Sequence, residues 1–359
     1  MDVVIVKVGT QVITHDSGTL NKRRMGELVK QIAELKKKQL HVILVSSGAV
    51  GAARTYEKCF KNKNPVVQRQ VLAAIGQIDL LSNYKRLFEK EGVLSAQVLA
   101  TKEDFRDRHH YLNMKNCLEG LLKNGVLPIV NENDVIAVNE LMFTDNDELA
   151  ALIAAMLNAK ALWILTGVDG IFDRSPDDKE AELISSINPK KDNFNGVFSP
   201  VKSAFGRGGM HSKYRVAMNL SSLGISTSIA NGKTKGVLLD LCSGKKIGTK
   251  FIPQKKTSNV KMWLSQSAGQ EKGAVIINRC AEKELLSEDK VRSLLPIGIT
   301  KVEGEFSKGD VIQLKNEKKK VLGYGIAKYG SKIAKESIGI KGCKLLIHYD
   351  YLFLLNERH

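Results

Sequence analysis

The segment from Pro128 to Ala159 reads PIVNENDVIAVNELMFTDNDELAALIAAMLNA. It begins with the end of an apolar strand and continues into the acidic and amide residues Asn131–Asp134. A second cluster of the same kind, Thr144–Glu148, precedes apolar residues at helical spacing, which predicts a helix. One cluster therefore follows a strand and the other begins a helix, the two positions at which open α/β sheets bind ligands.

This pattern also has a purely structural interpretation. Asp145 followed by Glu148 fits a capping box at the start of a helix, and Asn131–Asp134 fits a turn. Capping accounts for part of the pattern, but it does not account for two acidic and amide clusters on either side of one short excursion. We therefore interpret the two clusters as a candidate binding site.

The residues before this segment alternate between predicted strands and predicted helices. Val3–Val8 is a continuous apolar run, as expected for a parallel strand buried on both faces. Further strands are predicted at His41–Val45 and Val93–Leu99, and helices at Leu20–Lys38, Gln68–Lys90 and Tyr111–Lys123. The alternation predicts an α/β fold in which helices cover both faces of an open, mostly parallel sheet.

The sequence after this segment continues the sheet and then changes in kind. Strands are predicted at Ala161–Leu165, Ile225–Ala230 and Gly236–Leu241. The low apolar density and the five lysines of Gly244–Ser258 predict a linker. Beyond it, short apolar runs and frequent glycine turns predict a small β-barrel-like domain. The expected domains are therefore 1–243 and 259–359, joined by a linker over 244–258.

The chain carries 55 basic and 38 acidic residues, a net charge of +17, which raises nucleic acid as a partner. The excess is spread along the chain, since the part from Glu271 onward holds 17 basic and 12 acidic residues. Most of the basic residues are lysine, whereas recognition of phosphates and base edges relies on arginine. We therefore attribute the charge to general lysine enrichment.

The five cysteines are scattered and form no CxxC pair, which argues against a disulfide framework or a zinc site and favours a reducing compartment. The first residues, Met1–Thr10, enter a strand directly and lack the features of a leader. The most apolar window, Leu149–Leu165, contains Asn158 and Lys160 and is predicted as a helix followed by a strand. These features predict a cytoplasmic protein without a membrane segment.

Residues suited to phosphate chemistry follow several of the predicted strands. Lys7 lies near the end of the first strand, before a turn at Gly9, and Ser47 and Gly48 follow the second strand. Lys213 lies in the first turn of a predicted helix, after a glycine-rich segment. Parallel topology gathers strand carboxyl ends on one edge of a sheet, so these residues and the acidic clusters are expected to meet there. Lysines at a glycine-lined anion site, with carboxylates that orient them or bind Mg²⁺, suit phosphoryl transfer.

Each of these features has a less specific interpretation. A lysine at a strand end can extend to solvent, and Ser/Gly turns are common in α/β proteins. The motifs GxGxxG and GxxxxGK[ST] are absent, so neither a Rossmann dinucleotide site nor a P-loop has support. The absence of a Ser-His-Asp or Cys-His arrangement weighs against covalent hydrolysis. The residues by themselves predict a phosphate-handling α/β enzyme.

Taken together, five ordered motifs resemble the amino acid kinase family. They are VKVGT (6–10), VSSGAVG (45–51), PIVNEND (128–134), TDNDELAA (144–151) and GGMHSK (208–213). Residues Val260–Tyr349 resemble the PUA domain, so the resemblance covers nearly the whole chain. The NEND and DND clusters resemble those of family members that phosphorylate glutamate. The resemblance implies an amino acid kinase fold with an appended PUA domain.

The resemblance also implies an activity and its partners. The reaction would be ATP-dependent phosphorylation of the γ-carboxylate of L-glutamate to L-glutamyl 5-phosphate, the first step of proline biosynthesis. ATP would be the co-substrate, with Mg²⁺ on its phosphates and no metal site in the protein itself. A homo-oligomer, either a dimer or a tetramer, is expected, with proline as a feedback inhibitor and RNA as a ligand of the PUA-like domain.

Matching motif positions carries the family's residue roles onto this chain. Lys7 and Lys213 would neutralise the transferring phosphoryl group, and Asp147 would hold their ammonium groups. The acceptor would contact Ser47, Gly48, Asn131, Asp134, Asp145 and Asn146, with Asp134 suited to its α-ammonium group. The nucleotide would contact Lys7, Gly9, Thr166, Gly167, Arg207, Gly208, Gly209, Met210 and Lys213. No general base is needed, because the attacking carboxylate is already ionised at neutral pH.

Two departures from the family pattern lie in the nucleotide half. The family usually has an acidic residue where this chain has Gly167, and it often reads TGGMSTK where this chain has Arg207 and His211. Both bear on nucleotide affinity or base preference. Two other functions stay open: a family kinase for another acceptor, such as aspartate, acetylglutamate, carbamate or UMP, and an RNA-binding protein whose kinase fold is vestigial.

Overall fold

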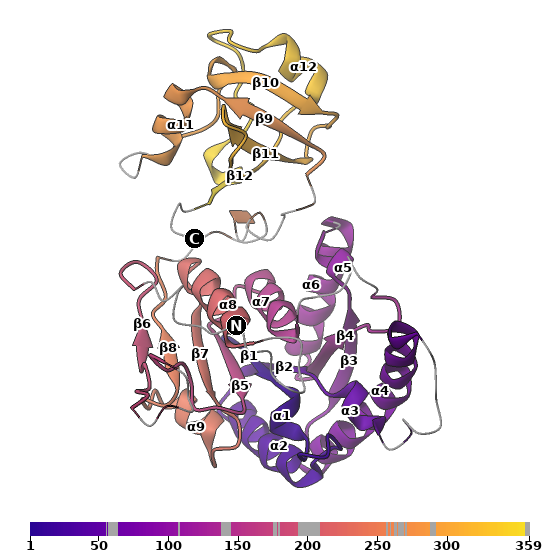
Figure 1. Ribbon diagram of the computed structural model, residues 1–359. Coiled ribbons are helices and arrows are strands. Elements are labelled where there is room, and N and C mark those ends of the chain that lie inside the picture. Colours follow the sequence, from indigo (N-terminus) through magenta and orange to yellow (C-terminus); the bar gives the residue numbers. More distant parts are fainter. Residues whose placement is uncertain are drawn as a thin grey trace. The chain divides into compact units, whose positions relative to one another are not determined.

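Figure 1 shows the computed structural model of the chain, which consists of two compact units, Met1–Lys256 and Thr257–His359. It describes the chain except residues 55, 57–63, 107, 138–144, 175–177, 179, 193–208, 256–257, 259, 262–263, 265–268, 270, 288–291 and 356–359, and the side chains of 65, 106, 108 and 109. No helix within the described part of the chain is long and apolar enough to cross a membrane.

The first unit is built on an eight-stranded sheet with the strand order β3-β4-β2-β1-β5-β7-β8-β6. Its strands are β1 (Val3–Val8), β2 (His41–Ser46), β3 (Ser95–Ala100), β4 (Leu127–Glu132), β5 (Ala161–Thr166), β6 (Ser186–Ile187), β7 (Ser226–Asn231) and β8 (Thr249–Phe251). Neighbouring strands pair in parallel except β7 and β8, which are antiparallel. The predicted open, mostly parallel sheet is therefore confirmed.

Helices cover both faces of this sheet (Figure 1). On one face lie α2 (Lys22–Lys37), α4 (Pro65–Lys90) and α9 (Val237–Cys242), and on the other α6 (Arg108–Lys123), α7 (Asn146–Met156) and α8 (Met210–Ser222). The shorter helices α1 (Thr10–Ile13), α3 (Ala49–Ala52) and α5 (Lys102–Arg106) follow β1, β2 and β3. The fold thus has the three layers that alternating strands and helices predict.

The central strand β1 shows how the sequence places a charged residue inside this sandwich. All six of its residues are buried, because a parallel strand in mid-sheet is covered on both faces. Successive side chains point to opposite faces, and Val4, Val6 and Val8 join the core that contains α2 and α4. Lys7 therefore points to the face that carries α7. Since Lys7 is only 4% exposed, that face must supply an anion.

The second unit has a separate core around a five-stranded sheet with the order β10-β9-β11-β12-β13. Its strands are β9 (Gly273–Ile277), β10 (Ile299–Gly304), β11 (Val311–Asn316), β12 (Val321–Ile326) and β13 (Leu352–Leu354), and its helices include α11 (Arg279–Leu286) and α12 (Ser331–Glu336). Strands β9 and β11 pair in parallel, whereas the other neighbours are antiparallel. A small β-rich region after the first unit agrees with the expectation from sequence.

Sequence and structure differ in two places near the end of the first unit. Gly236–Leu241 is predicted as a strand, but Val237–Cys242 forms α9, whose buried side chains pack against α2. A short apolar run fits either element by periodicity, and packing decides between them. Gly244–Ser258 is predicted as a linker, but Thr249–Phe251 forms β8 between β7 and β6, and the Phe251 side chain is fully buried.

Candidate active site

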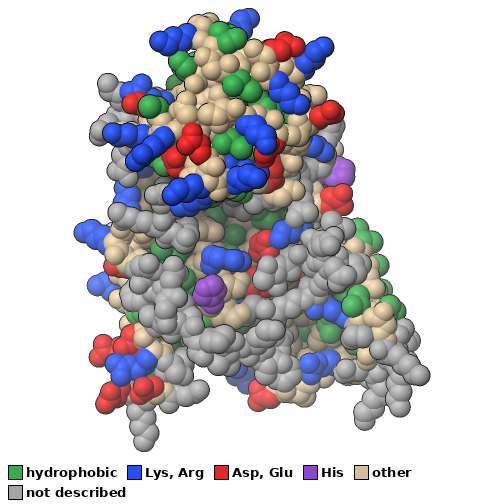
Figure 2. Space-filling model, turned by 45° about the horizontal axis from the view of Figure 1, so that its top comes forward, with side chains coloured by type: hydrophobic (Ala, Val, Ile, Leu, Met, Phe, Trp, Pro, Cys, Tyr) green, Lys and Arg blue, Asp and Glu red, His purple; other side chains and the backbone are tan. Residues whose placement is uncertain are grey.

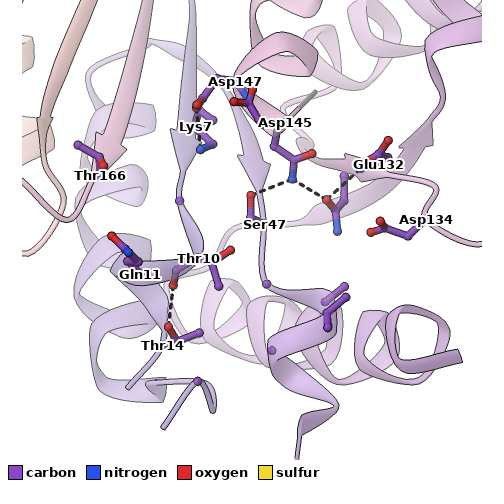
Figure 3. A pocket seen from close by; sticks show the side chains of 18 of the residues that line it. Lys7, Thr10, Gln11, Thr14, Ser47, Glu132, Asp134, Asp145, Asp147 and Thr166 are labelled. Carbon is purple, nitrogen blue, oxygen red and sulfur yellow. Dashed lines mark hydrogen bonds and ion pairs between the residues drawn. The ribbon is translucent and has the colours of Figure 1, made fainter. Parts of the chain in front are cut away.

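A cavity of about 410 Å³ lies where the carboxyl ends of β4, β2, β1 and β5 meet (Figure 3). The predicted site residues that line it are Lys7, Gly9, Ser47, Gly48, Asn131, Asp134, Asp145, Asn146, Asp147, Thr166, Gly167 and Lys213. Gly209 and Met210 begin α8, as its N-cap and its first helical residue. Arg207 and Gly208 lie outside the described residues.

Two lysines meet one carboxylate in this cavity. Nζ of Lys7 is 2.6 Å from Oδ1 of Asp147, and Nζ of Lys213 is 3.0 Å from Oδ2 of the same residue. The Asp147 side chain is fully buried, and those of the lysines are 5% and 9% exposed. One anion thus holds together the end of β1 and the first turns of α7 and α8. Because the group has two positive charges and one negative charge, it is suited to bind an anionic ligand.

The protonation state of Asp147 follows from these contacts. Burial acts to raise the pKa of this carboxyl group, but the ammonium groups of Lys7 and Lys213 outweigh it and hold the pKa of Asp147 below its ordinary value of 3.8. A lowered pKa means that the ionised form stabilises the fold above the ordinary carboxyl pKa. This contribution is lost only as the pH falls through the lowered value. Asp147 is therefore an anion throughout the neutral range.

Asp145 fixes the start of α7 and so positions Asp147. Its backbone is extended, and Oδ1 accepts hydrogen bonds from the backbone N–H groups of Asp147 (3.0 Å) and Glu148 (3.1 Å). Oδ2 accepts a hydrogen bond from Oγ of Ser212 in α8 (2.7 Å). Burial, and then the charge of Asp147, raises the pKa of Asp145. Capping is therefore a structural role of this residue, as the sequence suggested, and it also ties α7 to α8.

Two substitutions of Asp145 should distinguish the contribution of its hydrogen bonds to stability from the contribution of its charge. Asp145→Ala is expected to lower the free energy of unfolding by about 1 kcal/mol, since it removes the cap acceptor. Asp145→Asn keeps an acceptor oxygen and removes a buried charge whose raised pKa marks its ionised form as unfavourable in the fold. The Asn variant should therefore be at least as stable as the parent at pH 7. Urea unfolding of the parent and the two variants measures these free energies. An equal loss of stability in Asp145→Ala and Asp145→Asn would contradict the capping role.

A hydrogen-bonded amide group forms the other side of the cavity. Nδ2 of Asn146 lies 2.9 Å from both Oγ of Ser47 and Oδ1 of Asn131, and 3.1 Å from the backbone oxygen of Ser46. Asn131 in turn donates to Oε1 of Gln77 in α4 (2.8 Å). Side chains after β2, at the end of β4 and at the start of α7 are therefore locked together. Their amide and hydroxyl groups line the same cavity as the lysine–aspartate group, and Figure 3 shows Ser47 of this set together with Lys7 and Asp147.

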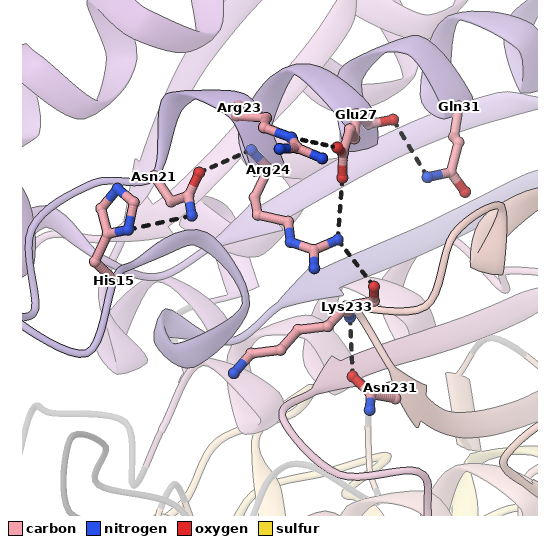
Figure 4. Close-up of polar contacts among 8 residues, drawn as sticks. All are labelled: His15, Asn21, Arg23, Arg24, Glu27, Gln31, Asn231 and Lys233. Carbon is pink, nitrogen blue, oxygen red and sulfur yellow. Dashed lines mark hydrogen bonds and ion pairs between the residues drawn. The ribbon is translucent and has the colours of Figure 1, made fainter.

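The turns on the Thr166 side are held by backbone hydrogen bonds. The Gly9 N–H donates to the Leu165 oxygen (3.0 Å), and the Gly232 N–H donates to the Thr166 oxygen (2.9 Å). Figure 4 shows how the turn after β7 is tied to the start of α2. Nη1 of Arg24 donates to the backbone oxygen of Lys233 (2.9 Å) and to Oε2 of Glu27 (3.0 Å). The loops after β1, β5 and β7 thus form one connected wall.

Comparisons with known proteins agree with this arrangement. A model of the amino acid kinase family matches residues 2–231, and a model of the PUA domain matches residues 273–347. The chain is 50% identical to the glutamate 5-kinase of Chlorobaculum tepidum over 98% of this chain and 97% of that protein. It is 46% identical to the glutamate 5-kinase of Bacteroides thetaiotaomicron over 98% of each. The chain belongs to the amino acid kinase family, among the glutamate 5-kinases.

Solved structures confirm the family fold of the first unit. Carbamate kinase from Giardia lamblia bound to AMP-PNP aligns with a TM-score of 0.52 at 19% identity, over 70% of this chain and 98% of that one. An isopentenyl phosphate kinase from T. acidophilum aligns with a TM-score of 0.51 at 20% identity, over 69% and 99%. At these identities the likeness establishes the amino acid kinase fold. The family resemblance and the fold class expected from sequence are both confirmed.

Several cavity residues of this family member were not predicted from its sequence. They are Thr10, Gln11, Thr14, Gly18, Ala49, Val50, Gly51, Arg54, Arg69 and Glu132. Nη2 of Arg69, on α4, lies 3.1 Å from Oδ1 of Asp134, so the predicted acceptor residue Asp134 is held by an arginine 65 residues away in sequence. Six of them fall within or adjoin recognised motifs, which is the signal that could have found them: Thr10, Gln11, Ala49, Val50, Gly51 and Glu132. The two arginines lie outside every motif.

Proposed function

We propose that the chain transfers the γ-phosphoryl group of ATP to the γ-carboxylate of L-glutamate. The products are L-glutamyl 5-phosphate and ADP, and the reaction opens proline biosynthesis. The observation that carries phosphoryl transfer is the pair of buried lysines on one carboxylate in an open cavity. The glutamate 5-kinases to which the chain is similar over nearly its full length support glutamate as the acceptor.

The mechanism requires charge neutralisation and alignment. An oxygen of the ionised γ-carboxylate attacks the γ-phosphorus, a new O–P bond forms, and the bond to the β-phosphate oxygen breaks with its electrons going to ADP. Lys7 and Lys213 neutralise the negative charge on the transferring group and on the leaving phosphate. Asp147 keeps both ammonium groups in place before the nucleotide arrives. Because the nucleophile is already ionised, no side chain needs to remove a proton.

The acceptor side supplies polar groups of both kinds. Ser47, the Gly48 turn, Asn131 and Asn146 border the lysine–aspartate group and are suited to orient the γ-carboxylate. Asp134, whose side chain is 13% exposed, is suited to the α-ammonium group, with Arg69 holding its other side. Both carboxylate oxygens of Asp145 already accept hydrogen bonds, one from the first turn of α7 and the other from Ser212. We therefore assign Asp145 a positioning role rather than direct contact with glutamate.

The residues present fit a Mg²⁺ ion carried by the nucleotide. Both oxygens of Asp147 contact lysines, and both oxygens of Asp145 accept hydrogen bonds. Among the described residues, groups of three or more His, Cys, Asp or Glu that could hold a metal are absent. Mg²⁺ commonly keeps water and phosphate ligands instead of an all-protein cage. When bound, it would further screen the phosphate charge next to Lys7 and Lys213.

Trapping the acyl phosphate tests the proposal directly. ATP, Mg²⁺, hydroxylamine and L-glutamate should give a hydroxamate with the purified chain, while aspartate and acetylglutamate in place of glutamate should give little. A hydroxamate from another acceptor alone would assign a different family activity. Folded protein that is silent with all three acceptors would refute the proposed reaction and favour the RNA-binding alternative.

Asn146→Asp should damage the acceptor side selectively. The substitution replaces the amide that donates to three oxygen atoms by a carboxylate. The new carboxylate oxygen and these acceptor oxygens then repel one another. We expect the KM of glutamate to rise about 10–100-fold and the KM of ATP to change little. Asn83→Asp serves as the matched control, because Asn83 also donates to a backbone oxygen, that of Asp79 in α4, but does not line the cavity. Equal rises in both KM values would show that the damage is general.

We also propose that proline inhibits by occupying the acceptor side, because proline resembles a cyclised glutamate. Proline should then raise the apparent KM of glutamate in the hydroxamate assay. An unchanged glutamate saturation curve would exclude this idea. A cytoplasmic location and a homo-oligomer, either dimer or tetramer, complete the proposal, and sedimentation velocity measures the oligomeric state.

RNA is the ligand that we propose for the PUA domain, on the strength of the family match at residues 273–347. Lys and Arg side chains are interspersed with Asp and Glu on the face that Figure 2 shows, so electrostatics alone would give modest affinity. Because each contact with a phosphate releases counterions, the binding of a structured RNA should still weaken between low and physiological salt. Undetectable binding at low salt would remove RNA from the proposal.

A further inference from the structure

Gly167 and Gln11 compete for one space in the cavity wall. Gly167 follows β5, and Gln11 is the second residue of α1. A Cβ atom at position 167 would lie 2.8 Å from Oε1 of Gln11, 3.6 Å from its Cβ and 3.8 Å from its Cδ. The first distance is shorter than carbon and oxygen atoms normally approach. The Gln11 side chain therefore fills the volume that any side chain at 167 would need.

The geometry around this pair is fixed by backbone contacts. The Gly9 N–H donates to the oxygen of Leu165, which joins the turn that carries Gln11 to the strand that precedes Gly167. Gln11, Thr166 and Gly167 all line the cavity. Figure 3 shows Gln11 on the Thr166 side of the cavity, away from Ser47 and Asp134. The pair thus belongs to the side opposite the acceptor residues.

The Gln11 side chain is available to a ligand. It is partly exposed, and within the part of the chain that the structure describes its amide has no hydrogen-bond partner. A primary amide offers two N–H donors and one acceptor oxygen. Phosphate and ribose oxygens are matching partners. The Gln11 amide lines the cavity yet makes none of the hydrogen bonds by which the other polar residues of this cavity support one another.

We propose that Gln11 binds an oxygen of the nucleotide, and that the missing side chain at Gly167 is what lets its amide reach this position. The proposal rests on the proposed function, because it takes the Thr166 side of the cavity as the nucleotide side. In this chain Gln11 supplies, from α1, the polar group that the turn after β5 lacks.

A double-mutant cycle tests the inference. Gln11→Ala removes the amide and should raise the KM of ATP, and weaken ADP binding in calorimetry, by about 3–10-fold, the value of one hydrogen bond. Gly167→Ala should do the same with the fold intact, because the new methyl group displaces the far end of a flexible side chain. In the Gln11→Ala background the second substitution should add little, since the group that it displaces is already gone. The KM of glutamate should stay constant throughout.

The controls separate this inference from the proposed function. Gly120→Ala, in a helix with open space at its Cβ position, should leave ADP binding unchanged. Comparing ATP with 2′-deoxyATP shows which oxygen Gln11 binds. If it is a ribose hydroxyl, the parent prefers ATP and Gln11→Ala does not. If it is a phosphate oxygen, Gln11→Ala loses affinity for both nucleotides equally. Unchanged ADP affinity in Gln11→Ala, or fully additive losses, would overturn the inference even if the parent phosphorylates glutamate. An inactive parent that still shows the cycle with ADP would instead reject the proposed function alone.

Discussion

Asp147→Asn is expected to lower turnover with ATP and glutamate by ~10³-fold or more and to destabilise the fold by about 3–5 kcal/mol. The substitution leaves two buried ammonium groups without their shared anion. They repel each other, and neither is held where a phosphoryl group needs it. Asn preserves the size of the side chain and its backbone N–H, so the hydrogen bond to the Asp145 cap is kept. The loss therefore reports on the charge.

Urea unfolding and the hydroxamate rate measure the two effects. ADP or ATP supplies negative charge to the two buried lysines, so saturating nucleotide should raise the melting temperature of Asp147→Asn more than that of the parent. Asp2→Asn is the matched control, since it removes the same carboxylate from an ion pair with Lys160 in which both side chains are 61% exposed. That control should stay within about 0.5 kcal/mol of the parent. A stable and active Asp147→Asn protein would refute the central role of this carboxylate.

The sequence could predict the need for Asp147 but not its geometry. An apolar strand with a lysine near its end requires an anion nearby, and the family resemblance, rather than the residue pattern, assigns this role to Asp147. Asp145 and Asp147 are nearly equivalent in sequence, however, and either could have met Lys7. Their roles diverge because Asp145 lies outside the helix and caps its first turn, whereas Asp147 lies inside that turn. This difference of backbone conformation appears only once the helix start is fixed.

Features that depend on contacts between residues far apart in the chain could not be predicted from the sequence. Strand β8 has only three residues and lies in a lysine-rich stretch. It is recognised as a strand by its pairing with β7 and β6, because its own sequence shows no strand pattern. Arg69 lies on a long helix where its charge looks like that of any solvated face, yet it reaches Asp134. Gln11 and Gly167 are 156 residues apart in sequence and are brought together because the segments that carry them follow two neighbouring strands, β1 and β5. Periodicity predicts elements, whereas such contacts require the strand order.

Lys213→Ala is expected to lower turnover by ~10²–10³-fold, the usual cost of removing one group that stabilises transition-state charge. The fold should tolerate this change better than Asp147→Asn, because Asp147 keeps its 2.6 Å contact with Lys7. Lys213 comes from the first turn of α8 and Lys7 from the end of β1, so the two approach the same carboxylate from different elements. The KM of glutamate should change little if Lys213 acts on the phosphoryl group rather than on the acceptor.

Lys102→Ala is the matched control for this experiment. Lys102 forms an ion pair of 2.9 Å with Glu148, the residue that follows Asp147, but both side chains are about a quarter exposed and neither lines the cavity. It should keep a near-parental rate. In an Asp147→Asn background, Lys213→Ala should cost far less than it does alone, because a lysine that has lost its anchor contributes little. Full additivity of the two losses would mean that Lys213 works without Asp147, and a near-parental rate for Lys213→Ala would remove it from the catalytic group.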